Sequence, residues 1–401
     1  MKRVVMFAHT TMTLITCVYY GAKVKERDRN IRTVLIWENS SSYSISLKPF
    51  SVYFDEMYTV SAHIGDGERF SMESIVKDME WRSYLRKSDV GDMLGEPCER
   101  EILMLGSDYF HIMKNIIRIF CAKKNAHQVV LFEEGLLLYD ENKGSIKEKI
   151  AYKLGKNENE LSIIGKSSKI DVIFARKPQE LPEWKQKNRR IIAQSDVFSD
   201  DKIFTKMLYA DQHLRQLSER LKDKKVILYL GQPIWELSKT FRFQTERNLI
   251  DHLVQALPEG YVVLMKGHPR ESANKYRRYA SDPRCAVFDK SSGWYPIECL
   301  LQLFTIKAVM ACASSAALNV AERIDGCRAV YTYPCLDVKI PDNWSTMFEG
   351  AGDKVVILKN LDAIQQVFTT PENEELMAKK ERTGKDVSYL MWYLGRTNGT
   401  K

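Results

Sequence analysis

The chain has 401 residues, of which 44% are hydrophobic, and it carries a formal net charge of +8 at pH 7. This length favours two domains of ordinary size, and the apolar content excludes a disordered chain. The positive charge favours anionic partners, such as a nucleotide sugar, an acidic glycolipid or a membrane surface. Nucleic acid is not expected, because the basic residues are scattered and form no recognised nucleic-acid module.

Cysteine usage and the apolar runs indicate the surroundings of the chain. The eight cysteines show no CxxC pairing or zinc-ligand spacing, and several lie in apolar runs, so a reducing compartment is expected. Polar residues from His9 to Thr13 interrupt the first apolar run, which argues against a signal peptide. No uncharged apolar stretch reaches the length needed to cross a bilayer.

Strand-like and helix-like segments alternate through the first half of the chain. This alternation predicts a largely parallel, doubly wound sheet. A polar, lysine-rich excursion is expected over 140–165, and an irregular segment over 177–190. The expected strands are 2–8, 32–37, 51–59, 102–105, 128–132 and 171–175, and the expected helices are 12–23, 70–85, 109–123 and 200–222.

A second alternation of strand-like and helix-like segments starts at Lys225, and it predicts a second Rossmann-like domain. We therefore expect domains at 1–222 and 223–372, followed by a C-terminal helix and tail over 373–401. The strands expected in the second domain are 226–230, 261–265, 285–288, 309–312, 329–332 and 354–358. The helices expected from there onward are 244–257, 296–304, one from 315, 361–368 and 374–394.

A basic loop with one histidine follows the expected strand 261–265. Its residues are Lys266-Gly267-His268-Pro269-Arg270. The carboxyl end of a strand is where α/β proteins bind ligands. Gly267 lets the backbone approach a ligand closely, and Pro269 restricts the conformation of His268. The loop favours an anionic ligand that gains charge during a reaction, with a surface turn as the alternative.

Two further segments place polar groups at strand ends. Glu133-Glu134-Gly135 follows the strand 128–132, and Ser314-Ser315 follows the apolar run 308–313 and opens a helix. Serine caps helix N-termini, and the free N–H groups there also attract anions. Capping alone explains one serine, and two serines fit capping together with phosphate binding.

Glu-Glu-Gly, His-Pro and Ser-Ser, in this order and each at a strand end, resemble the motifs shared by bacterial sialyltransferases. The resemblance covers residues 1–370. Glycosyltransferase family 52 is judged the closest group, and the polysialyltransferase-type family, which has the same three motifs, is the near competitor. The resemblance implies a GT-B-like fold, with two Rossmann-like doubly wound domains facing a central cleft.

The activity implied by this resemblance is an inverting, metal-independent sialyl transfer. The donor would be cytidine monophosphate (CMP)–sialic acid, and the acceptor a galactose-terminated glycan or glycolipid of the lipooligosaccharide or capsule type. No cofactor or metal is expected, since no DxD-type motif stands at a strand end. A cytoplasmic location is implied, with peripheral attachment to the inner face of the bacterial membrane and a homodimer both left open.

Sialyl transfer needs a group that stabilises the departing phosphate. His268 matches the histidine of His-Pro and is the candidate general acid, with a histidine that ties down its own loop as the alternative. Glu298 could hold the ribose or stabilise a helix start, and Thr10 could touch the sialyl carboxylate or cap a helix. The other donor-side candidates are Lys266, Gly267, Pro269, Arg270, Ser314, Ser315, Gly231 and Gln232.

The acceptor hydroxyl needs a base, and three carboxylates are candidates. Glu133 and Glu134 are adjacent on a strand end, so they point in different directions. We favour Glu134 and expect burial to raise its pKa toward neutrality. Families with this motif often have aspartate at its second position, so Glu236, in the first loop of the second domain, is the rival. For Glu236, a solvated loop charge is the alternative.

Two other functions remain open from the sequence. The same fold could use another nucleotide sugar, or the chain could bind sugars or nucleotides without catalysis. Release of CMP from the donor would distinguish an enzyme from a binding protein. The motifs do not determine the linkage or the acceptor, because acceptor loops vary on a rigid scaffold.

Overall fold

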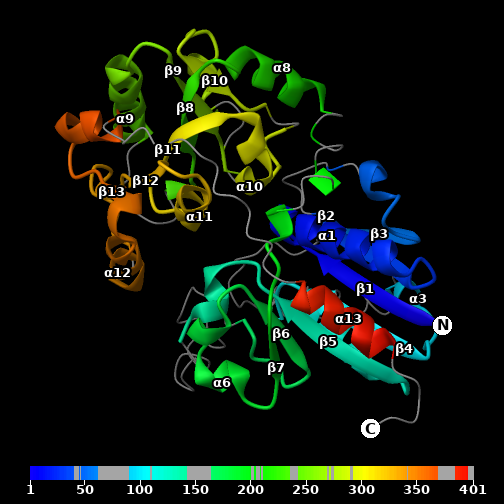
Figure 1. The fold of residues 1–401 in the computed structure, drawn as a ribbon. Coiled ribbons are helices and arrows are strands. Elements are labelled where there is room, and N and C mark those ends of the chain that lie inside the picture. Colours follow the sequence, from blue (N-terminus) through cyan, green and yellow to red (C-terminus); the bar gives the residue numbers. More distant parts are fainter. Residues whose placement is uncertain are drawn as a thin grey trace, which may run out of the picture. The chain divides into compact units, whose positions relative to one another are not determined.

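The protein is described from a computed structural model, in which two compact units are formed by Met1–Ser199 with Glu381–Lys401, and by Asp200–Lys380 (Figure 1). Each unit contains one parallel sheet with helices packed on it. The structure describes residues 1–39, 45, 47–61, 90–108, 111–141, 164–199, 203–204, 208, 211–234, 243–268, 271, 275–289, 292–340, 342–368 and 384–395.

The first unit is built on a seven-stranded parallel sheet in the order β3-β2-β1-β4-β5-β6-β7. Its strands are β1 Lys2–Ala8, β2 Arg32–Asn39, β3 Glu56–Ser61, β4 Arg100–Leu105, β5 Ala126–Phe132, β6 Val172–Ala175 and β7 Arg190–Ala193. Its helices are α1 Thr11–Arg27, α3 Val90–Leu94, α4 His111–Cys121, α6 Glu183–Gln186 and α13 Lys385–Gly395. Short 3₁₀ helices are η1 Lys48–Phe50, η2 Leu136–Tyr139, η3 Pro178–Glu180 and η4 Val197–Ser199.

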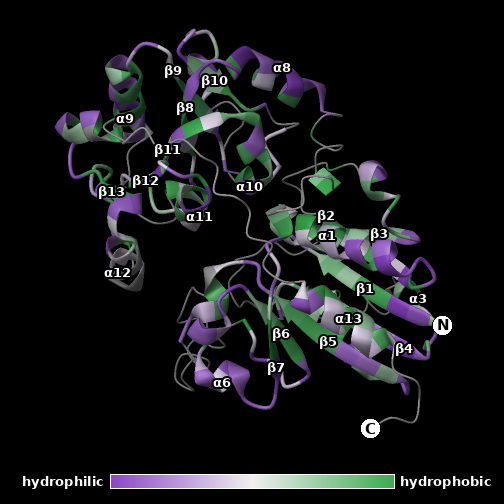
Figure 2. Ribbon diagram, in the orientation of Figure 1, coloured by the Kyte–Doolittle hydropathy of each residue, from purple (hydrophilic) through white to green (hydrophobic). Residues whose placement is uncertain are grey.

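The central strands of this sheet are covered on both faces. Side chains alternate between the faces of a strand, so Val5 and Phe7 of β1 pack with α4 on one side, while α1 covers the other. This double covering explains why the strands are apolar along almost their whole length. Figure 2 shows β1 and β5 in green along most of their length and purple at their first residues.

The second unit is built on a six-stranded parallel sheet in the order β10-β9-β8-β11-β12-β13. Its strands are β8 Lys225–Leu230, β9 Tyr261–Lys266, β10 Cys285–Val287, β11 Thr305–Ala311, β12 Arg328–Tyr331 and β13 Val355–Ile357. Its helices are α8 Gln212–Leu221, α9 Phe243–Ala256, α10 Ile297–Leu300, α11 Ser315–Arg323 and α12 Asp342–Gly350. Short 3₁₀ helices are η6 Arg277–Tyr279, η7 Leu301–Leu303, η8 Gly352–Lys354 and η9 Leu361–Phe368.

Both sheets have Rossmann-like strand orders. Successive strands are added toward one edge of the sheet and then, after one point, toward the other edge. The reversal lies between β1 and β4 in the first unit, and between β8 and β11 in the second. In such sheets the crevice beyond the carboxyl ends of the strands at the reversal is the usual ligand site. The two expected Rossmann-like sheets are confirmed, and the strand order marks where each unit would bind its ligand.

The division into units differs from the expected boundary at 222/223. Helix α8 belongs to the second unit, because Ser218 Oγ donates to Leu303 O (3.2 Å) and Arg220 donates to Cys285 O (2.7 Å). This helix starts only at Gln212, since Asp211 caps it by accepting from Leu214 N–H (3.1 Å).

The returning helix α13 belongs to the first unit and lies beside α1 (Figure 1). Its buried Asp386 accepts hydrogen bonds from the Tyr20 hydroxyl of α1 (2.7 Å) and from the N–H and hydroxyl of Ser195 (both 2.7 Å). A buried carboxylate with three such donors is well compensated for its lost hydration. The first unit is therefore completed by a segment that follows the second unit in the sequence.

Several expected elements differ in extent. Strand β3 begins at Glu56 and not at residue 51, because Pro49 lies in the 3₁₀ turn η1 and Asp55 accepts from Thr33 N–H (2.7 Å). Strand β7 and helix α12 were not expected. The expected helix 70–85 and most of the excursion 140–165 lie outside the described residues.

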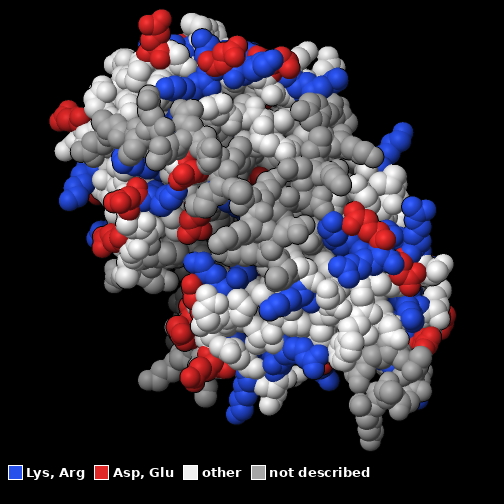
Figure 3. Space-filling model, viewed as in Figure 1, with Lys and Arg blue, Asp and Glu red and all other residues white. Residues whose placement is uncertain are grey.

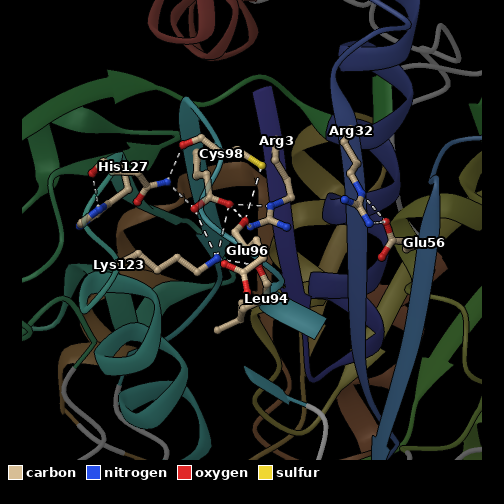
Figure 4. Close-up of polar contacts among 10 residues, drawn as sticks. Arg3, Arg32, Glu56, Leu94, Glu96, Cys98, Lys123 and His127 are labelled. Atoms are coloured by element: carbon tan, nitrogen blue, oxygen red, sulfur yellow. Dashed lines mark hydrogen bonds and ion pairs between the residues drawn. The ribbon is translucent and has the colours of Figure 1, made fainter. Parts of the chain in front are cut away.

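A buried ionic cluster occupies the amino end of the first sheet, opposite the edge formed by the carboxyl ends of its strands. Figure 4 shows Arg3 of β1 and Lys123 converging there. The fully buried Glu101 of β4 pairs with Arg3, lies 3.4 Å from Lys123 Nζ, and accepts from Asn125 Nδ2 (2.6 Å). Two cations and an amide compensate this carboxylate, which therefore has a structural role.

The surface charge is distributed over both units. On the described part of the face in Figure 3, lysine and arginine side chains are interspersed with aspartate and glutamate. Among the described residues, none of the helices is long and apolar enough to span a bilayer.

Candidate active site

The first turn of α1 holds the Glu134 carboxylate at the carboxyl edge of the first sheet. Thr10 caps α1 in a capping box, in which its Oγ1 accepts from Thr13 N–H (3.1 Å) and Thr13 Oγ1 accepts from Thr10 N–H (2.9 Å). The Thr10 hydroxyl donates to Glu134 Oε1 (2.6 Å), and His9 Nε2 lies 3.2 Å from Glu134 Oε2. Residues that follow β1 and β5 therefore meet at one point.

The electrostatics of Glu134 correct one expectation from the sequence. Burial taken alone would raise the pKa of Glu134, as we expected. The charge of His9 and the hydrogen bonds from His9 and Thr10 outweigh burial, so the pKa of Glu134 lies below its ordinary value. The expected rise was wrong because these two partners lie far away in the sequence. Glu134 is thus an anionic carboxylate at neutral pH, with a side chain that is 20% exposed.

Gly106, directly after β4, leaves the space in which this group is packed. A Cβ atom at Gly106 would lie 2.5 Å from Thr13 Cγ2, 3.2 Å from Phe132 Cε2 and 3.3 Å from Glu134 Oε2. Contacts this short require the neighbours to move. The position therefore requires glycine, because Thr13 of α1 and the Glu134 carboxylate leave no room for a Cβ atom.

Glu133 has different surroundings from its neighbour. Its side chain is almost fully buried, where it accepts from Arg176 Nε (2.5 Å), from Arg176 N–H (2.6 Å) and from the hydroxyl of Tyr139. Tyr139 lies in η2, immediately after the Glu-Glu-Gly segment. These contacts tie the turn to the segment that follows β6, so the two glutamates differ in geometry as adjacent strand residues should.

In the second unit, the loop after β9 is fixed through its main chain. Glu271 accepts from His268 N–H (2.8 Å) and donates its own N–H to His268 O (2.9 Å). Lys266 Nζ donates to Gly293 O (2.7 Å), which joins this loop to the segment before α10. Burial, opposed by nearby Glu298, lowers the pKa of Lys266 to about 8.

The start of α11 lies at the reversal point of the second sheet. Ser314 is the N-cap and accepts from Ala316 N–H (3.3 Å), and Ser315 is the first helical residue. Gln232, after β8, accepts from Ala313 N–H (2.7 Å). The carboxyl ends of β8 and β11 are thereby joined at the amino end of α11, where the helix dipole favours an anion.

The ribose candidate Glu298 lies in the first turn of α10 and is buried. Its Oε1 accepts from Asn319 Nδ2 of α11 (3.4 Å), so it joins α10 to α11. Of the remaining candidates, Gly231 follows β8 and packs against the side chains of Tyr276 and Glu271. Glu236, Pro269 and Arg270 lie outside the described residues.

The structure therefore groups the sequence candidates in two sets. Thr10, Glu133 and Glu134 lie in the first unit, and Thr10 both caps α1 and binds Glu134. The described donor-side candidates of the second unit lie at or after the carboxyl ends of β8, β9 and β11, or in the first turn of α10. They are Gly231, Gln232, Lys266, Gly267, His268, Glu298, Ser314 and Ser315. No group of three or more His, Cys, Asp or Glu side chains in the described part of the chain is arranged to hold a metal ion.

Sequence reasoning missed three residues that define these sites. In the sequence His9 stands out only as a polar residue that interrupts the first apolar run, and Gly106 and Glu271 do not stand out. Each follows the last residue of a strand by one to five residues, at 9, 106 and 271. A systematic reading of the polar and glycine residues after every strand would have found all three.

Comparison with known families decides the class of the protein. A family model described as alpha-2,8-polysialyltransferase (POLYST) matches residues 24–333. The chain belongs to this family. Membership in the polysialyltransferase family makes it a glycosyltransferase of the sialyltransferase type. This family was the near competitor in the sequence analysis, and the preference for family 52 is not confirmed.

Solved structures similar to this polysialyltransferase-family chain show its fold. A sialyltransferase from Photobacterium damsela has a TM-score of 0.52 and 13% identity, over 89% of this chain and 81% of that one. A putative UDP-N-acetylglucosamine 2-epimerase from Listeria monocytogenes has a TM-score of 0.61 and 11% identity, over 98% and 96%. The fold is GT-B-like. A search of curated protein sequences finds no match.

Proposed function

We propose that the chain is an inverting sialyltransferase that uses CMP–sialic acid, with Glu134 as the base. The observation that carries this proposal is the anionic Glu134 carboxylate, held by His9 and Thr10 at the carboxyl edge of the first sheet. A base must be unprotonated to act, and this carboxylate is unprotonated at neutral pH. Membership in the polysialyltransferase family supports the donor class.

The proposed reaction is a single displacement at the anomeric carbon of the sialyl group. The acceptor oxygen forms a bond to this carbon from the side opposite the phosphate, while the bond from the carbon to the phosphate oxygen breaks. Glu134 takes the proton of the acceptor hydroxyl. Each oxygen of Glu134 has one partner in the protein, and a carboxylate offers about four lone-pair sites, so acceptance of this proton is feasible.

The departing CMP takes the electron pair and gains charge on its phosphate. We assign stabilisation of this charge to His268 as acid or hydrogen-bond donor, and to the N–H groups at the start of α11, where Ser314 and Ser315 lie. Lys266 adds positive charge to the same loop as His268. Because the donor carries a single phosphate, these groups suffice in this proposal and the reaction is metal-independent.

Two acceptors are distinguished within this proposal. The motif resemblance implies a galactose-terminated glycan, whereas the name of the matching family favours a glycan that ends in sialic acid. Both acceptors offer a hydroxyl that Glu134 could deprotonate. Offering the purified protein CMP–sialic acid with each acceptor, and analysing the product by mass spectrometry, separates them. Repeated addition to the sialylated acceptor would identify a polymerising enzyme.

The donor is tested with a panel of nucleotide sugars. Turnover with CMP–sialic acid, and none with uridine or guanosine diphosphate sugars, is the expected result. Transfer from a diphosphate sugar alone would favour the alternative glycosyltransferase. Tight binding of CMP–sialic acid without release of CMP, in transfer or in hydrolysis, would favour a binding protein.

The base is tested by replacing Glu134 and its rival with glutamine, which keeps the shape and removes the basicity. We expect Glu134→Gln to lower kcat by about 10²–10⁴-fold while CMP binding stays unchanged. Glu236→Gln should keep kcat near that of the unmodified protein. If Glu134→Gln is active and Glu236→Gln is not, the base lies in the first loop of the second unit.

A further inference from the structure

A buried ionic network lies beneath the His268 loop and outside the motifs of the sequence analysis. It consists of Glu271 and Lys275 after the loop, Glu246 of α9 and Tyr229 of β8. The charged side chains are almost fully buried, with 1% exposure for Glu246 and Glu271 and 6% for Lys275. Ionic groups this deeply buried are costly unless each has partners, so the contacts of each member define what the network does.

The partners form a continuous path from His268 to the sheet. Glu271 Oε1 pairs with Lys275, whose Nζ lies 2.6 Å from Glu246 Oε2. Glu246 Oε1 accepts from the Tyr229 hydroxyl (2.9 Å). Lys275 is therefore held between two carboxylates, and the path ends on a buried tyrosine of the central strand β8.

The other oxygen of Glu271 reaches the proposed catalytic loop directly. Glu271 Oε2 accepts from His268 N–H (2.8 Å), while Glu271 N–H donates to His268 O (2.9 Å). Both main-chain polar groups of His268 are thus bonded to one residue. A charge-assisted bond to a carboxylate is stronger than a neutral one, and this carboxylate is itself fixed by Lys275.

Gly231 shows how closely the network is packed against the other strand end. A Cβ atom at this position would overlap the hydroxyl of Tyr276 and Oε2 of Glu271. The Tyr276 hydroxyl also lies 3.3 Å from both Glu271 Oε2 and Glu246 Oε1. The residues that follow β8 and β9 are therefore packed on the same carboxylate.

We propose that Glu271 is a positioning residue, which holds the main chain of His268 in the orientation needed to act on the departing phosphate. The inference rests on the proposed role of His268 in catalysis. A buried carboxylate–ammonium–carboxylate group contributes little net stability compared with apolar packing. Because this group contacts both main-chain polar groups of His268, we assign it the role of fixing the geometry of His268. Catalysis by orientation requires that the residue contacting the reacting group, here His268, is held in a fixed position.

The test replaces Glu271 with glutamine. His268 N–H and Lys275 Nζ contact different oxygens of Glu271, and in glutamine one of these positions becomes an NH2 group that cannot accept, so one of the two contacts is lost. We expect kcat to fall by about 10–10²-fold, while KM for CMP–sialic acid stays within about threefold, because the donor contacts are retained. Glu259→Gln, the same change at an exposed residue just before β9, should leave both values unchanged.

A double-mutant cycle separates positioning from a general structural effect. If Glu271 acts through His268, adding Glu271→Gln to His268→Ala should cause no further loss of kcat. If Glu271→Gln lowers kcat in the His268→Ala background by the same factor as in the unmodified protein, the inference is overturned. An unchanged kcat in Glu271→Gln, with His268→Ala impaired, would overturn it while leaving the proposed function intact. An unchanged kcat in His268→Ala would remove the role of His268 itself, and the inference with it.

A second variant covers the case in which Glu271→Gln does not fold, as judged by thermal unfolding. Tyr276→Phe removes only the hydroxyl that contacts Glu271 and Glu246. It should give the same pattern in a weaker form, with lowered kcat, unchanged KM and no added loss in the His268→Ala background. A fall in kcat that persists in that background would overturn the inference.

Discussion

Replacing Gly106 with alanine adds one methyl group at the point where the cap of α1 meets Glu134. The new Cβ would lie 2.5 Å from Thr13 Cγ2. A carbon–carbon contact is favourable at about 3.5–4.0 Å, so the two groups must separate by about 1 Å. Thr13 cannot move alone, because its Oγ1 accepts from the N–H groups of His9 and Thr10 (both 2.9 Å).

The displacement should therefore affect both folding and catalysis. Overpacking a buried site costs about 1–3 kcal/mol in the free energy of unfolding. Moving His9 and Thr10 also moves the Glu134 carboxylate that they hold. Since misplacing a reacting group by about 1 Å costs on the order of 10²-fold, we expect kcat to fall by that order.

Two measurements on the same protein check this expectation: thermal unfolding, and transfer from CMP–sialic acid at saturating donor. Gly135→Ala is the matched control for stability. Gly135 lies next to Glu134, its φ of 176° is extended, and no described atom lies within 4 Å of a Cβ built there. The control should keep the unfolding temperature of the unmodified protein.

A Gly106→Ala protein with unchanged unfolding temperature and unchanged kcat would refute this reasoning. It would mean that the cap of α1 can shift without disturbing Glu134, or that Glu134 is not the base. A destabilised protein with unchanged kcat would refute only the catalytic part, and would leave Gly106 as a packing residue.

The remaining predictions concern the charges of the two sites. His9→Asn should move the acidic limb of the kcat–pH profile to higher pH. Burial raises the pKa of Glu134 and His9 lowers it, so removing His9 lets this pKa rise. The base then becomes protonated at a higher pH as the solution is acidified. An unmoved limb in a folded variant would contradict this. Changing Ser314 and Ser315 together to alanine should weaken CMP binding in calorimetry by about 10-fold, and equal affinity would leave them only a capping role. EDTA should leave transfer intact, and a complete loss restored by magnesium or manganese would argue for a metal-dependent reaction.

The sheet was predictable because its strands are buried on both faces. Runs such as 129–132 and 262–265 are apolar throughout and buried, and the described strands β5 and β9 contain them. Strand β7 at the sheet edge was missed, because its short RIIA run follows basic residues and is only partly buried. Helix α12 was missed because DNWSTMFEG has only nine residues, so its apolar residues at helical spacing, Trp344, Met347 and Phe348, are too few to form a clear repeat.

The sequence predicted which strand ends carry the site residues, but not which of these residues contact one another. Parallel strands bring their carboxyl ends to one edge, so the sequence indicated that Thr10 and Glu134 share an edge. That Thr10 donates to Glu134 across 124 residues of sequence has no local signal. The sign of the pKa change at Glu134 depended on this contact and on His9, which is why burial alone predicted the wrong direction.

The contact between Tyr20 and Asp386 has a consequence for biosynthesis. The two residues are 366 positions apart, so at 5–20 residues per second the ribosome needs about 20–70 s to supply the partner of Tyr20. By the end of this time the second unit has been synthesised completely, while the face of α1 that α13 covers in the folded protein is still uncovered. We expect the nascent chain to acquire its second unit first and to depend on chaperones at α1. The helix whose first turn holds Glu134 is then stabilised last, so a chain that stops before residue 385 should retain an intact second unit and lose acceptor activation.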